Sequence, residues 1–206
     1  MTSSADINGL IRRAQEGDVA AFQKVISSHL GQARRFARGF SSNEQDADDL
    51  AQEALVKAYR SLRSYRFRSS FSTWLFRITR NVCIDAARSR AAKEKARQAS
   101  LRASRACDEL AVQPDAQLAR EQDRQRLWNA LNRLPGEFRS VILLFYVEGM
   151  SHDEIAAIER IAVGTVKSRL SRGRRRLREL LRPAASTRPP AGNLSGPSLV
   201  KPEGSP

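Results

Sequence analysis

The sequence is poor in the residues that hold covalent and metal-bound scaffolds together. Its two cysteines, Cys83 and Cys107, are far apart, and there is no Cys-x-x-Cys pair. The two histidines, His29 and His152, are also far apart. Structural zinc and a disulfide framework are therefore both excluded as organising principles, and we expect no metal and no other cofactor.

Long apolar runs are missing as well. The longest, Val141–Val147, falls far short of the roughly 18 residues that a membrane-spanning helix needs. Residues 1–6 have neither the basic segment nor the apolar segment of a secretory signal. We therefore expect a cytoplasmic protein that does not insert into a membrane.

Motifs that carry catalysis are absent too. There is no GxxxxGK[ST] phosphate loop, no Gly-x-Ser-x-Gly and no HExxH. We expect the protein not to be an enzyme.

Proline is rare before residue 183, where only Pro114 and Pro135 occur, and the other six prolines follow with glycine and serine. Such a tail cannot build a core, so we expect residues 183–206 to be disordered. Before it, apolar residues recur at helical spacing and no alternating strand pattern occurs. Residues 92–118 are charged and lack an apolar stripe. The prediction is an all-α chain with helical domains at 1–91 and 119–182 joined by a linker at 92–118.

What the sequence has in excess is positive charge. It carries 36 Lys and Arg against 22 Asp and Glu, a net charge of +14. A well-hydrated surface would account for part of this excess, but its size favours a polyanionic partner such as nucleic acid.

The C-terminal domain has the pattern of a helix-turn-helix. Ser151 and Glu154 have the spacing of a capping box, which starts a short helix. After a break, a second helix from Val163 carries arginines on most of its faces, with Leu177, Leu180 and Leu181 expected on its buried side. In this motif the second helix enters the major groove. A basic helix that is merely solvated is the alternative.

The segment Gly164-Thr-Val-Lys-Ser-Arg-Leu170, preceded by Glu154-Ile-Ala156 and Leu134-Pro135, resembles region 4 of bacterial extracytoplasmic-function sigma factors. That resemblance implies recognition of the minus-35 promoter element and docking on the polymerase beta flap. The chain departs from the family at Glu159, usually apolar, at Arg160, often glycine, and at Ser171, often bulkier. The implied DNA contacts are Thr165, Lys167, Ser168, Arg169, Ser171, Arg172 and Arg175.

The N-terminal domain carries a local cluster of acids. The cluster consists of Glu44, Asp46, Asp48, Asp49 and Glu53. Helix-end chemistry, with Asp46 as N-cap, would explain some of them, and an acidic face for a basic partner would explain the rest. The segment resembles sigma region 2.2, which implies binding to the beta-prime clamp helices of core RNA polymerase. The implied contacts are Asp46, Asp49, Gln52 and Glu53.

Arginines and aromatic residues alternate over residues 59–80, a pattern suited to single-stranded nucleic acid. Phe71 and Trp74 also fit a helix core, which is the alternative for both. Residues 71–81 resemble sigma region 2.3, which implies capture of a base flipped from the minus-10 element. Phe67 and Arg68 stand where the family commonly has a glycine and an acid. The implied DNA contacts are Arg66, Arg68, Ser69, Ser70, Phe71, Arg77, Arg80 and Asn81.

These resemblances together imply an RNA polymerase sigma factor of the short extracytoplasmic-function class. They imply a stress- or signal-responsive factor that binds core polymerase and promoter DNA, both duplex and single-stranded, and is held by an anti-sigma factor. The rival classes are an operator-binding regulator and a basic nucleic-acid adaptor. Neither rival needs both the acidic cluster and the arginine–aromatic segment.

Overall fold

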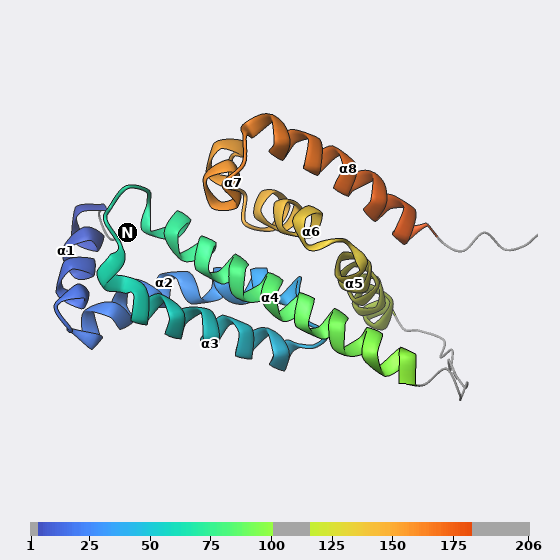
Figure 1. The fold of residues 1–206 in the computed structure, drawn as a ribbon, viewed down its shortest axis with the longest axis horizontal. Coiled ribbons are helices and arrows are strands. Elements are labelled where there is room, and N and C mark those ends of the chain that lie inside the picture. Colours follow the sequence, from blue (N-terminus) through green and yellow to red (C-terminus); the bar gives the residue numbers. More distant parts are fainter. Residues whose placement is uncertain (1–3, 101–115, 183–206) are drawn as a thin grey trace, which may run out of the picture.

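The computed structural model describes residues 4–100 and 116–182, and within these two ranges it contains helices and no strands (Figure 1). The predicted disordered tail and most of the predicted linker lie outside the described residues. The helices are α1 (Ser4–Gln15), α2 (Val19–Arg38), α3 (Glu44–Ser61), the 3-10 turn η1 (Leu62–Ser64), α4 (Phe71–Ser100), α5 (Ala116–Arg133), α6 (Gly136–Ile142), the π-helix η2 (Leu143–Val147), α7 (His152–Glu159) and α8 (Val163–Leu181).

Side-chain caps set where the first helices begin. Asp18 caps α2 by accepting a hydrogen bond from the Ala21 N–H at 2.9 Å. This bond, together with the Arg13 guanidinium, lowers the pKa of the Asp18 carboxyl. The prediction that Asp46 caps α3 is wrong. Asn43 is the N-cap because its side-chain oxygen lies three residues earlier and accepts from the Asp46 N–H at 2.7 Å.

The N-terminal domain packs α1 to α4 around an apolar core. Ile11 from α1, Phe22 and Val25 from α2, and Leu75 from α4 are all buried there. The long helix α4 continues past residue 91 to Ser100, so the first part of the predicted linker is helical.

The C-terminal domain packs α6, α7 and α8 together. Pro135 is the N-cap of α6. After η2 the chain turns at Gly149, whose φ of +67° suits a glycine. Helix α8 approaches α6 so closely at Gly173 that a Cβ there would lie 2.9 Å from Ile142 Cδ1.

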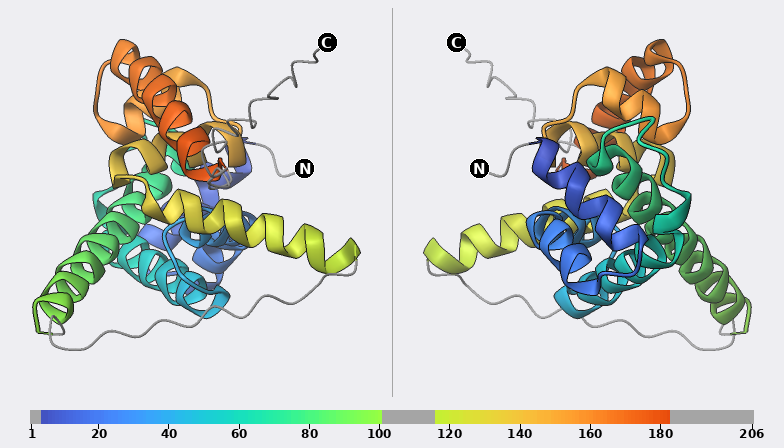
Figure 2. Two further views of the ribbon diagram at one scale, coloured as in Figure 1. Left: turned by 90° about the vertical axis from the view of Figure 1, so that its right-hand side faces the viewer. Right: turned by 90° about the vertical axis from the view of Figure 1, so that its left-hand side faces the viewer.

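The two domains do not lie apart but share one core (Figures 1 and 2). Phe36, Phe40 and Val82 from the first domain lie in the same buried cluster as Leu143 and Leu144 from the second. The sequence predicted two domains on a tether and gave no sign that they pack on each other. This shared core places α7 against α4 and η2 against α2.

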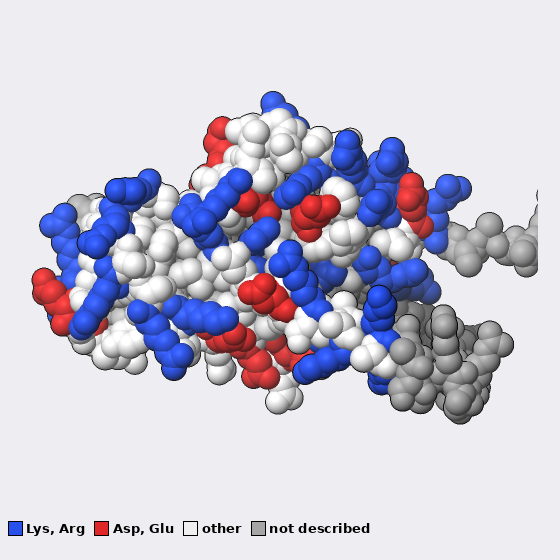
Figure 3. Space-filling model, in the orientation of Figure 1, with Lys and Arg blue, Asp and Glu red and all other residues white. Residues whose placement is uncertain are grey.

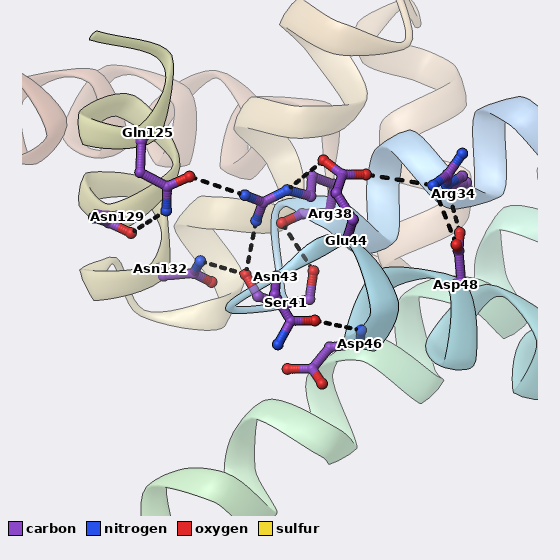
Figure 4. Close-up of polar contacts among 10 residues, drawn as sticks. All are labelled: Arg34, Arg38, Ser41, Asn43, Glu44, Asp46, Asp48, Gln125, Asn129 and Asn132. Atoms are coloured by element: carbon purple, nitrogen blue, oxygen red, sulfur yellow. Dashed lines mark hydrogen bonds and ion pairs between the residues drawn. The ribbon is translucent and has the colours of Figure 1, made fainter. Parts of the chain in front are cut away.

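Polar contacts close the edge of this interface (Figure 4). Asn132 on α5 donates a hydrogen bond to the Ser41 carbonyl at 2.8 Å, and Arg38 on α2 donates to Gln125 at 3.3 Å. Arg139 on α6 is buried, and its guanidinium lies over the Phe40 ring at 4.9 Å. Burial lowers the pKa of Arg139 to about 10.

Candidate nucleic-acid interface

The predicted helix-turn-helix is present, and its turn is held in a strained backbone conformation. The Ser151 side chain accepts from the Glu154 N–H while the Glu154 carboxylate accepts from the Ser151 N–H, which completes the capping box. Helix α7 ends at Arg160, whose φ of 56° and ψ of 48° are left-handed. Residues 160–162 then connect α7 to α8. The chain therefore keeps at Arg160 the geometry that a glycine would adopt most easily.

Helix α8 presents a basic face to solvent. Among the predicted minus-35 contacts, Lys167, Ser168, Ser171, Arg172 and Arg175 are exposed. Thr165 is half-buried in the first turn of α8, and its carbonyl accepts from the Ser168 hydroxyl at 2.9 Å. The face that the family resemblance assigns to the major groove is thus open to a ligand in this structure.

Arg169 lies apart from that exposed face. Its side chain is mostly covered and pairs with Glu137 at 3.2 Å and with Glu159 at 3.6 Å. The buried side of α8 consists of Val166, Leu170 and Gly173. Leu177 and Leu180, both predicted to be buried, are half-buried. The prediction for Leu181 is wrong, because this residue at the end of α8 is 42% exposed.

The loop at residues 65–70, which carries the predicted minus-10 contacts Arg66, Arg68, Ser69 and Ser70, is held in shape by its own side chains. The buried Tyr65 donates from its hydroxyl to the Ser69 carbonyl at 2.7 Å. The Ser70 hydroxyl accepts from the Thr73 N–H at 3.1 Å and so starts α4. Phe67 has a φ of 57°, the second left-handed non-glycine residue in the described ranges. Its ring lies 4.8 Å from that of Tyr65 and 5.6 Å from the Arg12 guanidinium.

The two rings that could have been core or ligand-binding are core. Phe71 is buried, Trp74 is half-buried, and both pack on Tyr65 beneath the loop. Burial raises the pKa of the Tyr65 hydroxyl. Exposed positions on the loop are Arg66, Phe67, Arg68 and Ser70.

The remaining predicted minus-10 residues are divided between solvent and the domain interface. Asn81 is exposed, and its side-chain oxygen accepts from Arg80 at 3.1 Å. Arg77 donates to the Ala157 carbonyl of α7 at 3.0 Å. Arg80 makes a two-pronged ion pair with Glu159, at 2.8 and 3.1 Å. The structure therefore does not place Arg77 and Arg80 on the same open surface as the loop.

Part of the acidic cluster is neutralised within the fold (Figure 4). Glu44 pairs with Arg34 and Arg38, and Asp48 pairs with Arg34. Neither predicted reading of the acids included these pairs. The signal was present, because Arg34 and Arg38 are four residues apart on the preceding helix and so lie on one face.

Exposed acids that do not pair with α2 lie further along α3. Asp49, Gln52 and Glu53 face solvent, and Glu53 pairs with Lys57 at 2.7 Å one turn later. A hollow of about 300 Å³ lies between α3 and α4, lined by Asp46, Asp49, Leu50, Glu53, Ala86, Ser89 and Arg90. Figure 3 shows a group of acidic side chains low on this face, with Lys and Arg spread around it. The charge pattern suits a partner that brings basic groups to α3.

Comparison with known families matches both domains. Residues 25–93 match Sigma-70 region 2, and residues 124–177 match Sigma-70 region 4. The chain is 32% identical over 178 residues to the ECF RNA polymerase sigma factor SigW of Bacillus subtilis, covering 84% of this chain and 95% of SigW. The chain belongs to the ECF sigma factors. As such, it acts in transcription initiation with RNA polymerase.

Further relatives of this sigma factor differ in length. It is 32% identical over 179 residues to the sigma-E factor of Escherichia coli K12, covering 84% of this chain and 93% of that protein. It is 35% identical over 178 residues to SigE of Mycolicibacterium smegmatis, where the match covers 80% of this chain and 64% of the relative. The chain thus spans under two thirds of that longer relative.

Solved structures agree with this assignment. The sigma factor resembles CnrH in its complex with the cytosolic domain of CnrY, with a TM-score of 0.61, 28% identity, and coverage of 84% of this chain and 94% of that one. It also resembles RpoE of Bartonella quintana in complex with the anti-sigma factor NepR, with a TM-score of 0.57, 34% identity, and coverage of 78% and 96%. Across the described ranges, none of the helices is long and apolar enough to span a membrane.

Proposed function

We propose that this sigma factor brings core RNA polymerase to promoters by reading the minus-35 element with α8 and the minus-10 strand with the loop before α4. The observation that carries this proposal is the capped helix-turn-helix whose second helix presents an open basic face. The domain division at 1–91, 92–118 and 119–182 is part of the proposal.

For the minus-35 duplex, α8 supplies two kinds of contact. Lys167, Ser168, Ser171 and Arg172 lie near its N-terminal half, where a recognition helix meets base edges. Arg175 lies one turn later and suits the phosphate backbone. Thr165 anchors the start of the helix through its carbonyl.

For the minus-10 strand, the exposed loop positions Arg66, Arg68 and Ser70 form the entrance to the site. Phe71 supports the loop from the core, and Ser69 is fixed through its carbonyl. Asn81 lies further along α4, is exposed, and is available to a displaced base. Flipping a base costs a few kcal/mol, which contacts to polymerase and to the captured base must offset.

For polymerase, Asp49, Gln52 and Glu53 form the exposed face of α3 that would meet the beta-prime clamp helices, with Asp46 at its edge. The C-terminal domain would meet the beta flap. The two similar solved structures are complexes, one with CnrY and one with the anti-sigma factor NepR. We therefore propose that this chain also has an anti-sigma partner. The proposal further includes a signal-dependent role in the cytoplasm and no catalytic activity.

The test separates the two DNA sites. Arg172→Ala is expected to cost about 1–3 kcal/mol in binding a minus-35 duplex with core present. Asn81→Ala is expected to slow formation of the open complex and to leave duplex binding unchanged. Electrophoretic mobility and permanganate footprinting measure the two steps. Equal loss of both steps in either variant would contradict the division of labour.

A further inference from the structure

Glu159, one of the departures from the family pattern, has a role that promoter reading does not explain. Its side chain is fully inaccessible to solvent although it ends α7 beside an exposed turn. Its carboxylate accepts bonds from Arg80 on α4, from the Ser140 hydroxyl on α6, and pairs with Arg169 on α8. Of these partners, only Arg80 belongs to the N-terminal domain. A carboxylate buried this deeply is costly unless it is paired, and Arg80 is the partner that links the two domains.

We propose that Glu159 is an interdomain clasp that closes the free sigma factor and removes Arg77 and Arg80 from DNA. The proposal rests on the proposed function, and on the family resemblance that assigns these two arginines to the minus-10 site. The contacts themselves are a property of the structure.

Geometry shows that the closed form is incompatible with reading a whole promoter. Arg80, assigned to the minus-10 site, and Arg169, assigned to the minus-35 site, bond to the same carboxylate. The two elements are centred about 25 base pairs apart, which is about 85 Å of duplex at about 3.4 Å per base pair. Both domains cannot reach their elements while this contact is made, so the clasp must open first.

Contacts around the clasp support the same closed form. Arg77 donates to the Ala157 carbonyl, and Arg35 on α2 pairs with Glu148 at 3.2 Å. Gly39 at the end of α2 touches Leu143, and a Cβ at Gly39 would lie 2.7 Å from Leu143 Cδ2. The φ of Gly39 is −69°, which any residue adopts. A larger side chain at Gly39 would therefore separate the domains without straining its own backbone.

The clasp leaves the polymerase-binding face free. Asp49, Gln52 and Glu53 remain exposed on α3 while α7 covers α4. Closure thus masks DNA-reading arginines rather than the docking helix. In the free protein it would suppress binding to DNA that is not presented by polymerase.

Two variants test the clasp by independent routes, and a third is a matched control. Glu159→Gln removes the charge that holds Arg80. Gly39→Val places a larger side chain against Leu143, which pushes the two domains apart without changing any charge. Glu137→Gln removes the other carboxylate that pairs with Arg169, yet this pair lies within the C-terminal domain. Only the first two are expected to open the molecule.

Opening is measured by single-molecule energy transfer in the full-length chain. Dyes are placed at Ser42→Cys and Arg133→Cys, two exposed positions that line one interdomain cleft, with Cys83→Ala and Cys107→Ser as background. Wild type is expected to show high transfer. Glu159→Gln and Gly39→Val are expected to raise the ratio of open to closed molecules at least tenfold, and Glu137→Gln to change it less than twofold. Unchanged transfer in a folded Glu159→Gln variant overturns the clasp. Should that variant fail to fold by circular dichroism, Gly39→Val decides.

Masking is measured by affinity for a fluorescent 20-nucleotide oligo(dT) without polymerase. Gly39→Val is expected to bind at least fivefold tighter than wild type, with no added charge to explain the gain. Unchanged affinity in an open Gly39→Val variant overturns the masking role. If wild type and all variants gave no core-dependent transcripts, the proposed function would be wrong. The energy-transfer measurement would still test whether the clasp exists.

Discussion

At the scale of single residues, two left-handed positions connect sequence to function. Phe67 and Arg160 are the non-glycine residues with positive φ in the described ranges, at 57° and 56°. The family resemblance places a glycine at both positions. Both residues adopt the left-handed backbone that glycine adopts most easily. For a residue with a Cβ this conformation costs on the order of 1 kcal/mol.

Arg160→Gly is expected to raise the stability of the sigma factor by about 1 kcal/mol because its exposed side chain gives up little packing. For a chain of this size that is about 2–4 °C in Tm. Phe67→Gly is expected to gain less, since it also loses ring contacts with Tyr65 and Arg12. Calorimetry measures both. Arg160→Ala keeps the Cβ, so an equal gain from alanine would contradict the strain argument.

Glu148 is expected to make stability depend on pH. Burial raises the pKa of its carboxyl above the ordinary value of 4.5, partly opposed by Arg35. The protonated form is therefore favoured in the folded state. Stability from this group is full below its ordinary pKa and is lost as pH rises through the raised value.

Glu148→Gln should accordingly be more stable than wild type at pH 7, and the difference should vanish near pH 4. Urea unfolding of both proteins at several pH values measures this difference. An advantage that stays constant from pH 4 to pH 7 would show that the effect is not the charge.

At the scale of helices, close packing of α8 on α6 holds the reading helix in place. Gly173 has Ile142 Cδ1 within 2.9 Å and Phe138 Cβ within 3.3 Å of where its own Cβ would be. Gly164, in the first turn of the same helix, has nothing within 4 Å. The two glycines thus differ in environment while sharing one helix.

Gly173→Val is expected to destabilise the protein by about 1–3 kcal/mol through overpacking. Gly164→Ala is expected to stabilise it by up to about 1 kcal/mol because glycine is a poor helix former. Thermal unfolding followed by circular dichroism measures both. A stabilising Gly173→Val would mean that α8 can move away from α6 at little cost.

Much of this element-level structure could be predicted from sequence, because caps and periodicity act over a few residues. The capping box at Ser151 and the cap at Asp18 are local in this sense. The Asn43 cap was missed since Asp46 offers the same kind of acceptor three residues later. An arginine does not by itself indicate the left-handed geometry at residue 160, and the signal was the glycine that the family often has there.

At the scale of the whole molecule, the shared core and the Glu159 clasp could not be read from the sequence. Arg80 and Glu159 are separated by 79 positions, and each is an ordinary surface residue type. Only the packing of α7 on α4 brings them together. The same packing bonds Arg77 to the Ala157 carbonyl of α7. Assignment of DNA contacts by resemblance therefore identifies the residues but not their state in the free protein.

The proposed function depends on α3 docking on core RNA polymerase. The most direct measurement is run-off transcription with bacterial core polymerase and a pool of genomic promoter fragments, using wild type and the Asp49→Arg, Glu53→Arg double variant. We expect discrete start sites that require the protein and disappear with the charge reversal. Absence of core dependence, together with nanomolar sequence-specific duplex binding by the protein alone, would contradict it and favour an operator-binding regulator.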